Sequence, residues 1–284
     1  MLLWALSFST IMSLAKALSP DLNSVVILFL RYLFGFICFV PFLIKTGSMA
    51  FYTTRPILHF IRVCCLVIAM ICSYYAYRHL PLVLATSVGM TGPLFTTMLA
   101  MLLLKDPVSL SKWGVIILGY LGVLVMVRPH DMSFDIGVGV ALLANLFAGF
   151  AIIAIKQLSR TESTATLMIY INTFTTIIAG ILVIAVWETP SSHDFTLLMM
   201  IGALGLLSQY ALVTAMKHAN PSYLAPFEYM RMCFAIPVGY FFFEEIPTFW
   251  VLLGSVIIIA ATYALTRLEL KTKFSQKQDQ SSSR

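Results

Sequence analysis

Residues 223–243 read YLAPFEYMRMCFAIPVGYFFF, a run that is apolar except at its centre, where Glu228 and Arg231 lie. A helix of about 20 apolar residues crosses the hydrocarbon core of a bilayer. A lone charge at that depth costs roughly 2.5 to 3.5 kcal/mol on insertion scales, so such groups normally face a protected cavity or a partner. Residues spaced by three lie on one face of a helix. The run predicts a polar site inside a membrane protein, and the alternative is a buried ion pair that only fixes helix packing.

The composition of the rest of the chain agrees with a membrane protein. Of 284 residues, 60% are hydrophobic and 11% are charged, against roughly 45 to 50% and 25% in a soluble domain. Ten apolar runs have about the length of a membrane span, and together they use most of the chain. We therefore predict an all-α integral membrane protein with ten transmembrane helices and no soluble domain. The predicted spans are Met1–Leu18, Val25–Ile44, Ile57–Tyr77, Val83–Leu104, Trp113–Val127, Ile136–Ile155, Ala165–Trp187, Phe195–Ala215, Tyr223–Phe243 and Phe249–Thr266.

The distribution of Lys and Arg predicts the orientation of these spans. With the N-terminus in the cytoplasm, 13 of the 18 basic residues, Arg62 among them, fall inside, three fall outside, and Arg31 and Arg231 lie within spans. Because cytoplasmic loops carry the excess of basic residues, both termini are expected in the cytoplasm of a multi-pass inner-membrane protein. The first span is expected to be retained, and residues 268–284 to form a cytoplasmic tail. The net charge of +6 then reflects topology, and we expect no nucleic-acid partner.

The two halves of the chain are similar in sequence. A shift of 140 positions matches Lys16 with Lys156, Pro81 with Pro221, Pro107 with Pro247 and Gly114 with Gly254. Each half, 1–130 and 136–267, holds five predicted spans, so the second half enters the membrane with the opposite orientation. Inverted repeats of this kind exchange inward-open and outward-open states around a central site. The alternative is a duplication retained only for packing.

Polar side chains at membrane depth need a partner or water, which makes them candidates for a site. Glu228 is the only acidic residue well inside a predicted span, so we expect it to bind a cationic part of a substrate or to carry a proton. Arg31 has three open roles: a partner of Glu228, a clamp for a carboxylate, or a side chain that extends to the membrane interface. Asn and Gln side chains at this depth have a structural alternative, because amides also form hydrogen bonds between helices. Aromatic rings have one too, because they also pack in the core or face lipid. The candidate substrate-binding residues are Glu228, Tyr229, Arg231, Arg31, Gln209, Asn145, Asn172 and Trp4.

Enzymatic motifs are not found in the sequence. The five histidines are scattered without HExxH spacing, and the dipeptide Gly-Lys of a P-loop does not occur. All five cysteines lie inside predicted spans, where thiols behave as small apolar groups. We therefore expect no enzyme activity, metal or cofactor, and any transport must be secondary or facilitated.

Several motifs resemble the EamA family of the drug/metabolite transporter superfamily. The first half carries Gly92-Pro93-Leu94-Phe95, Leu104-Lys105-Asp106, Trp113-Gly114 and Arg128-Pro129, and the second carries Ala225-Pro226-Phe227-Glu228-Tyr229 and Glu245-Ile246-Pro247. Asp106 stands where the family usually has glutamate. The resemblance covers nearly the whole chain and implies a transporter of small organic metabolites in a lipid bilayer.

Within that family, three stretches are similar to S-adenosylmethionine uptake transporters of intracellular bacteria. Two of them are Phe29-Leu30-Arg31-Tyr32 and the run from Arg55 to Arg62, and the third is Thr86-Ser87 with Pro93-Leu94-Phe95. Ala225-Pro226 before Tyr229 is a further point of likeness. Glu228 departs from this likeness by standing between two aromatic residues, and an acid there suits a sulfonium cation that carries adenine. The resemblance implies S-adenosylmethionine uptake. An exporter of amino acids or related metabolites, a non-transporting scaffold or sensor, and assembly as a homodimer stay open as alternatives.

Overall fold

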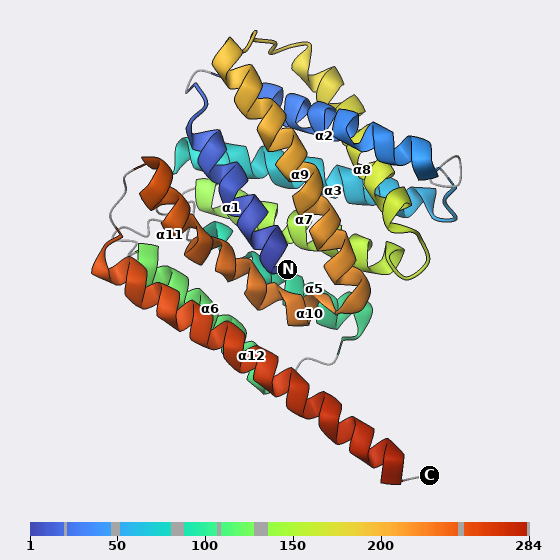
Figure 1. Cartoon of the computed structure of the whole chain (residues 1–284), viewed down its shortest axis with the longest axis vertical. Helices are drawn as coiled ribbons and strands as arrows, with labels where there is room; N and C mark the ends of the chain where they lie inside the picture. Colours follow the sequence, from blue (N-terminus) through green and yellow to red (C-terminus); the bar gives the residue numbers. More distant parts are fainter. Residues whose placement is uncertain are drawn as a thin grey trace.

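The computed structural model of the chain describes residues 1–19, 22–46, 52–80, 88–106, 109–127, 136–243 and 247–282. In these residues every regular element is a helix, and each predicted span contains at least part of one, which confirms the all-α membrane fold (Figure 1). The elements are α1 (Leu2–Lys16), α2 (Ser24–Thr46), α3 (Pro56–His79), α5 (Gly92–Leu104), α6 (Leu110–Val127), α7 (Ile136–Leu158), α8 (Thr164–Val183), α9 (Ser192–His218), α10 (Pro221–Leu224), the 3₁₀ helix η2 (Ala225–Tyr229), α11 (Met230–Phe243) and α12 (Phe249–Ser282).

The helices fall into a long and a short class. Five apolar stretches are long enough to cross a membrane: Ser24–Ile44 in α2, Pro56–Ser73 in α3, and the whole of α7, α8 and α9. The apolar parts of α1, α5, α6 and α12 span 10 to 17 residues. Helix α12 continues as one helix through the predicted tail to Ser282 and extends beyond the bundle in Figure 1.

The continuous ninth span predicted for Tyr223–Phe243 is wrong in one respect. The chain forms α10, then the 3₁₀ helix η2, and only then α11. Pro226 lies at the start of η2, and it has no N–H to continue an α-helical hydrogen-bond ladder. Residues 83–87 of the predicted fourth span lie outside the described residues.

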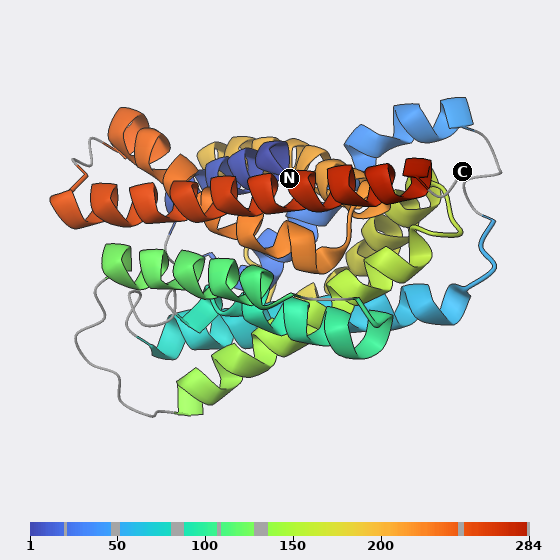
Figure 2. The same ribbon diagram turned by 90° about the horizontal axis from the view of Figure 1, so that it is seen from below.

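Helix packing follows an exchange of the two halves. Helix α3 packs on α7 as α1 packs on α9, and α5 packs on α7 as α11 packs on α1. Helix α6 pairs with its own counterpart α12, and α2 pairs with α8; Figure 2 shows α6 and α12 side by side. This symmetric set of contacts is expected if the five helices of the first repeat correspond, in chain order, to the five helices of the second. Most of the helix packing therefore lies between the two halves.

Polar contacts at the two ends of the bundle follow the same exchange. After α1, Ser19 donates its backbone N–H and its hydroxyl to Asp194 near the start of α9, at 3.0 and 2.7 Å. After α7, the Glu162 carboxylate accepts from the Thr53 hydroxyl and lies 2.5 Å from Nε2 of His59 near the start of α3. Because α1 and α7 are inverted counterparts, these contacts lie at opposite ends.

Basic residues gather at the Glu162 end. Arg55 before α3, Lys105 after α5 and Arg160 after α7 line one surface groove. The neighbouring Asp106 carboxylate accepts from Asn220 Nδ2 at 2.8 Å. The connections around α3, α5, α7 and α9 that were predicted to be cytoplasmic therefore meet at one end, as a chain that crosses the membrane alternately requires.

Candidate functional site

Two interrupted helices in corresponding positions of the repeats form the centre of the candidate site. Before α5, the chain turns at residues 90–91, and the N–H groups of Thr91 and Leu94 bond to carbonyls only three residues back. In the second half the equivalent interruption is η2. Tightened turns leave backbone groups free of the regular α-helical ladder. In membrane transporters such paired interruptions lie beside the substrate.

Asn145, near the middle of α7, holds the first interruption in place. Its Nδ2 donates to the carbonyl of Val88 at 2.8 Å and to the hydroxyl of Thr91 at 2.9 Å. A Cβ on Gly92 would lie 3.6 Å from Oδ1 of Asn145 and 3.9 Å from Oε2 of Glu228. The amide of Asn145 and the carboxylate of Glu228 therefore both lie beside Gly92, where the lack of a side chain leaves space between them.

The carboxylate of Glu228 is buried without a charged partner. Its residue is 8% exposed, and among the described residues it forms no hydrogen bond or ion pair. Arg231 is near enough to interact electrostatically with this carboxylate but forms no ion pair with it. Its Nη2 is 3.4 Å from the sulfur of Met90, and its guanidinium stands 5.1 Å from the ring centre of Phe8. Burying an unpaired charge is costly, so this carboxylate requires a cation, a proton or water.

Arg231 borders the site with unused hydrogen-bonding capacity. Its Nε is buried and has no hydrogen-bond partner in the part of the chain that is described. The Phe8 ring beneath the guanidinium supplies a cation–π contact. Arg231 thus lines the region between α1 and the first interruption.

Tyr229 and Trp4 lie in packed contacts. Tyr229 is fully buried, with its ring so close to α6 that a Cβ on Gly119 would lie 2.5 Å from Cδ2. Trp4 is 8% exposed and its ring centre is 5.5 Å from that of Phe8, in the core between α1, α8 and α9. Tyr229 packs against Met90 beside the first interruption, Val123 of α6 and Ile258 of α12.

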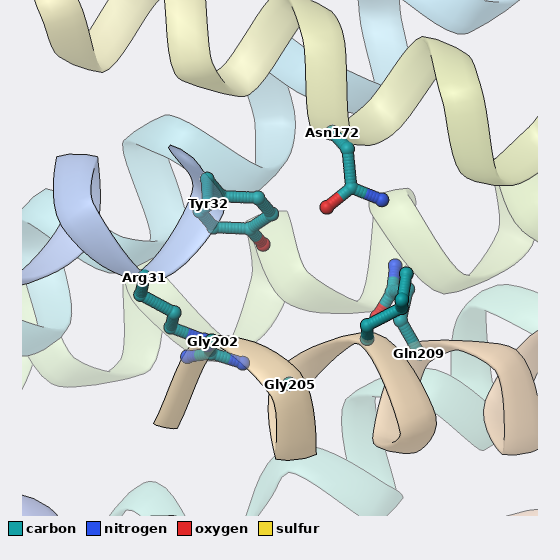
Figure 3. A pocket seen from close by; sticks show the side chains of 7 residues that line it. Arg31, Tyr32, Asn172, Gly202, Gly205 and Gln209 are labelled. Atoms are coloured by element: carbon teal, nitrogen blue, oxygen red, sulfur yellow. The ribbon is translucent and has the colours of Figure 1, made fainter. Parts of the chain in front are cut away.

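The remaining three candidates come together in a second place. Arg31 of α2, Asn172 of α8 and Gln209 of α9 line one small hollow with Tyr32 (Figure 3). The hollow measures about 10 Å³, which is the space of about one water molecule. The structure therefore separates the eight predicted residues into a group at the interrupted helices and a group around this hollow.

Sequence reasoning missed the polar cluster at the start of α3. His59 stacks on Tyr170 at 4.3 Å between ring centres, and Arg62, 1% exposed, donates to the carbonyl of Leu167 at 3.0 Å. The count of basic residues places Arg62 on the cytoplasmic side, and the structure shows that its side chain is buried against α8. The spacing of His59 and Arg62 by three, inside an apolar run, is the signal that identifies one shared helix face.

Lys156 is a second basic residue with a structural role. It is 7% exposed, and its Nζ donates to the carbonyls of Met216 and Ala219 at 2.8 Å each. These carbonyls lie at the end of α9, where no intrahelical donor remains and a cation is favoured. Lys156 therefore ties the end of α7 to the end of α9.

Comparisons with known proteins agree with this architecture. The model of the EamA-like transporter family matches residues 1–128 and 135–267. The S-adenosylmethionine uptake transporter of Rickettsia prowazekii (strain Madrid E) is 30% identical over 267 residues, covering 94% of this chain and 91% of the relative. A pseudopaline exporter of Pseudomonas aeruginosa (strain UCBPP-PA14) is 27% identical over 263 residues, covering 92% of each chain.

A solved crystal structure shares the fold. It superposes with a TM-score of 0.80 over 94% of this chain and 97% of the other, at 13% identity. A likeness at that identity concerns the fold alone, whereas the family match covers both halves of the sequence. The chain belongs to the EamA-like transporter family, a family of membrane transporters rather than enzymes.

Proposed function

We propose that this chain takes up S-adenosylmethionine across the inner membrane, by alternating access between the repeats 1–130 and 136–267. The observation that carries the proposal is the unpaired Glu228 carboxylate, which faces Gly92 where the two interrupted helices meet. A sulfonium cation placed there neutralises the carboxylate and removes the cost of its burial.

The named relatives support this choice of substrate class. A relative that matches 94% of this chain is an S-adenosylmethionine uptake transporter. S-adenosylmethionine carries a permanent positive charge on sulfur, and that charge is chemically suited to Glu228.

The orientation is part of the proposal. Arg55, Lys105 and Arg160 gather at the end of the bundle where the connection after α7 lies, and an excess of basic residues marks the cytoplasmic side. We place both termini in the cytoplasm on this ground. Reporter fusions at residues 1 and 284 test it, and a periplasmic signal at either end contradicts it.

Uptake of radiolabelled S-adenosylmethionine into cells that express the chain tests the function. We expect saturable accumulation in the wild type and a loss of at least about tenfold in Glu228→Gln, since one paired buried charge is worth more than about 1.4 kcal/mol. Glu188→Gln is the matched control, because Glu188 is exposed and lies after α8. Absence of saturable accumulation refutes the substrate, and full activity in Glu228→Gln removes Glu228 from the site.

Export is the second candidate. The relative from Pseudomonas aeruginosa is an exporter, and an alternating-access carrier works in either direction according to the gradients. Cells loaded with labelled amino acids or with S-adenosylmethionine distinguish the two functions. Efflux that is faster with the chain than without it, together with no net uptake, favours export. Membership in a transporter family speaks against the scaffold or sensor alternative.

A further inference from the structure

The hollow around Arg31 lies at mid-depth between the two repeats. It is bounded by α2 from the first repeat and by α8 and α9 from the second. Gly205, which lines it, has thirteen residues of α9 on either side within Ser192–His218. Asn172 is likewise close to the middle of α8. Substrate sites of inverted-repeat transporters lie near the membrane midplane, between the repeats.

The polar groups of the hollow have unused hydrogen-bonding capacity. Arg31 stands 5.6 Å from the ring centre of Tyr32, and among the described residues neither Arg31, Tyr32 nor Gln209 forms a hydrogen bond or ion pair. Asn172 uses its Nδ2 on the carbonyl of Met168, at 2.8 Å. No acidic residue is among those that line the hollow. A guanidinium with five donors is therefore present without a counter-ion.

Two glycines of α9 make room for this guanidinium. A Cβ on Gly205 would lie 3.2 Å from Nε of Arg31, and a Cβ on Gly202 would lie 2.5 Å from Cβ of Phe34. Figure 3 shows the Arg31 side chain lying along α9 at these two positions, with Tyr32 and Asn172 above it. The close approach of α2 to α9 therefore places the Arg31 side chain in the hollow beside Gly205.

The geometry points to a carboxylate-binding subsite at Arg31. The guanidinium offers two parallel N–H donors to a carboxylate, the pairing that gives the strongest charge-assisted hydrogen bonds. Gln209 and Tyr32 supply further donors at the same hollow. Because α2 and α9 belong to opposite repeats, their separation during the transport cycle enlarges a hollow that now has the volume of one water.

This inference rests on the proposed function and names its substrate class: a zwitterionic metabolite whose carboxylate binds Arg31 and whose cationic centre binds Glu228. It assigns separate roles to the two groups of polar residues. Substitution of Arg31 should therefore change the preference for ligands with a carboxylate, and substitution of Glu228 should change the preference for ligands with a cationic centre.

Competition binding to the purified full chain in detergent tests the inference, with labelled S-adenosylmethionine as the probe. The competitors are decarboxylated S-adenosylmethionine, which lacks only the carboxylate, and S-adenosylhomocysteine, which lacks the sulfonium charge. We expect the wild type to bind the decarboxylated compound about 10- to 100-fold more weakly than S-adenosylmethionine, the loss for one charge-assisted pair.

Substitution of Arg31 gives the decisive comparison. Arg31→Gln is expected to remove the preference for S-adenosylmethionine over its decarboxylated form while the preference over S-adenosylhomocysteine is retained. Arg31→Lys keeps the charge but not the paired donors, so an intermediate preference is expected and a folded sample is secured. Glu228→Gln should show the reverse pattern. The subsite is overturned if the wild type binds S-adenosylmethionine and its decarboxylated form with equal affinity. It is also overturned if Arg31→Gln keeps the wild-type preference between these two ligands.

Failure of the substrate is distinguishable from failure of the subsite. If S-adenosylmethionine does not bind, the proposed substrate is refuted. The subsite is then tested by the melting temperature of the chain with amino acids and with their decarboxylated amines. Stabilisation by at least one acid, absent for its amine and absent in Arg31→Gln, supports the subsite, since a ligand that binds the folded state raises that temperature. The subsite is overturned if no acid and amine pair shows this difference.

Discussion

Asp194 accepts hydrogen bonds from the backbone N–H and the hydroxyl of Ser19, a residue 175 positions earlier in the chain. Exchange of the two repeats converts this contact into the one between Glu162 and His59, at the opposite end of the bundle. Both contacts are formed in the structure, and the hollow between the repeats has the volume of one water. Each polar contact therefore joins the two repeats at one end of the bundle.

Substitution of one end contact should open that end. Asp194→Ala removes acceptors for Ser19 and Ser191, and each lost bond to a charged group is worth about 1.5 to 3 kcal/mol. We expect faster labelling of a cysteine introduced at Thr91 by an impermeant thiol reagent applied at the Ser19 end, in a background without native cysteines. Glu162→Ala should accelerate labelling from the opposite end only. Equal acceleration from both sides in either variant would show a loss of folding rather than a gate.

Asn145→Ala should weaken the interruption before α5. The substitution removes both hydrogen bonds from α7 to residues 88 and 91, at a cost of about 1 to 3 kcal/mol for the two. Thermal unfolding in detergent measures the effect, and uptake should fall with it. Asn172→Ala is the matched control for stability, because Asn172 bonds only to its own helix. A larger loss of stability in Asn172→Ala contradicts this role of Asn145.

The apolar runs predicted where the spans lie, because burial of about 20 residues in lipid leaves little freedom. They could not predict the interruption at η2: Pro226 is visible in the sequence, but membrane helices tolerate proline without breaking. Nor could they orient Tyr229, because the 3₁₀ geometry turns it toward Gly119 while Glu228 faces Gly92. The burial of Arg62 could not be predicted either, because a basic residue near a span end has the same sequence pattern whether it is solvated or buried.

Gly119→Ala should destabilise the contact between α6 and η2. The new methyl group would lie 2.5 Å from the Tyr229 ring, and overpacking of this kind costs about 1 to 3 kcal/mol. The melting temperature of Gly119→Ala is expected to fall. In the double variant with Tyr229→Ala, the loss of melting temperature should be smaller than the sum of the losses in the two single variants. Strict additivity of the two single variants would show that the residues do not interact. Gly139→Ala is the control, since no atom lies within 4 Å of its added Cβ.

Binding of the cationic substrate should weaken as the pH falls. Protonation neutralises the Glu228 carboxyl, so the attraction to a sulfonium cation is present when the group is ionised and lost below its titration. Affinity for S-adenosylmethionine, measured by competition between pH 5 and pH 8.5, should decrease on acidification in the wild type. In Glu228→Gln the decrease on acidification should be absent, because the glutamine amide gains no proton in that range. An unchanged pH dependence in Glu228→Gln would assign the titration to another group. A flat wild-type profile would show that protonation of Glu228 does not control binding of the cation.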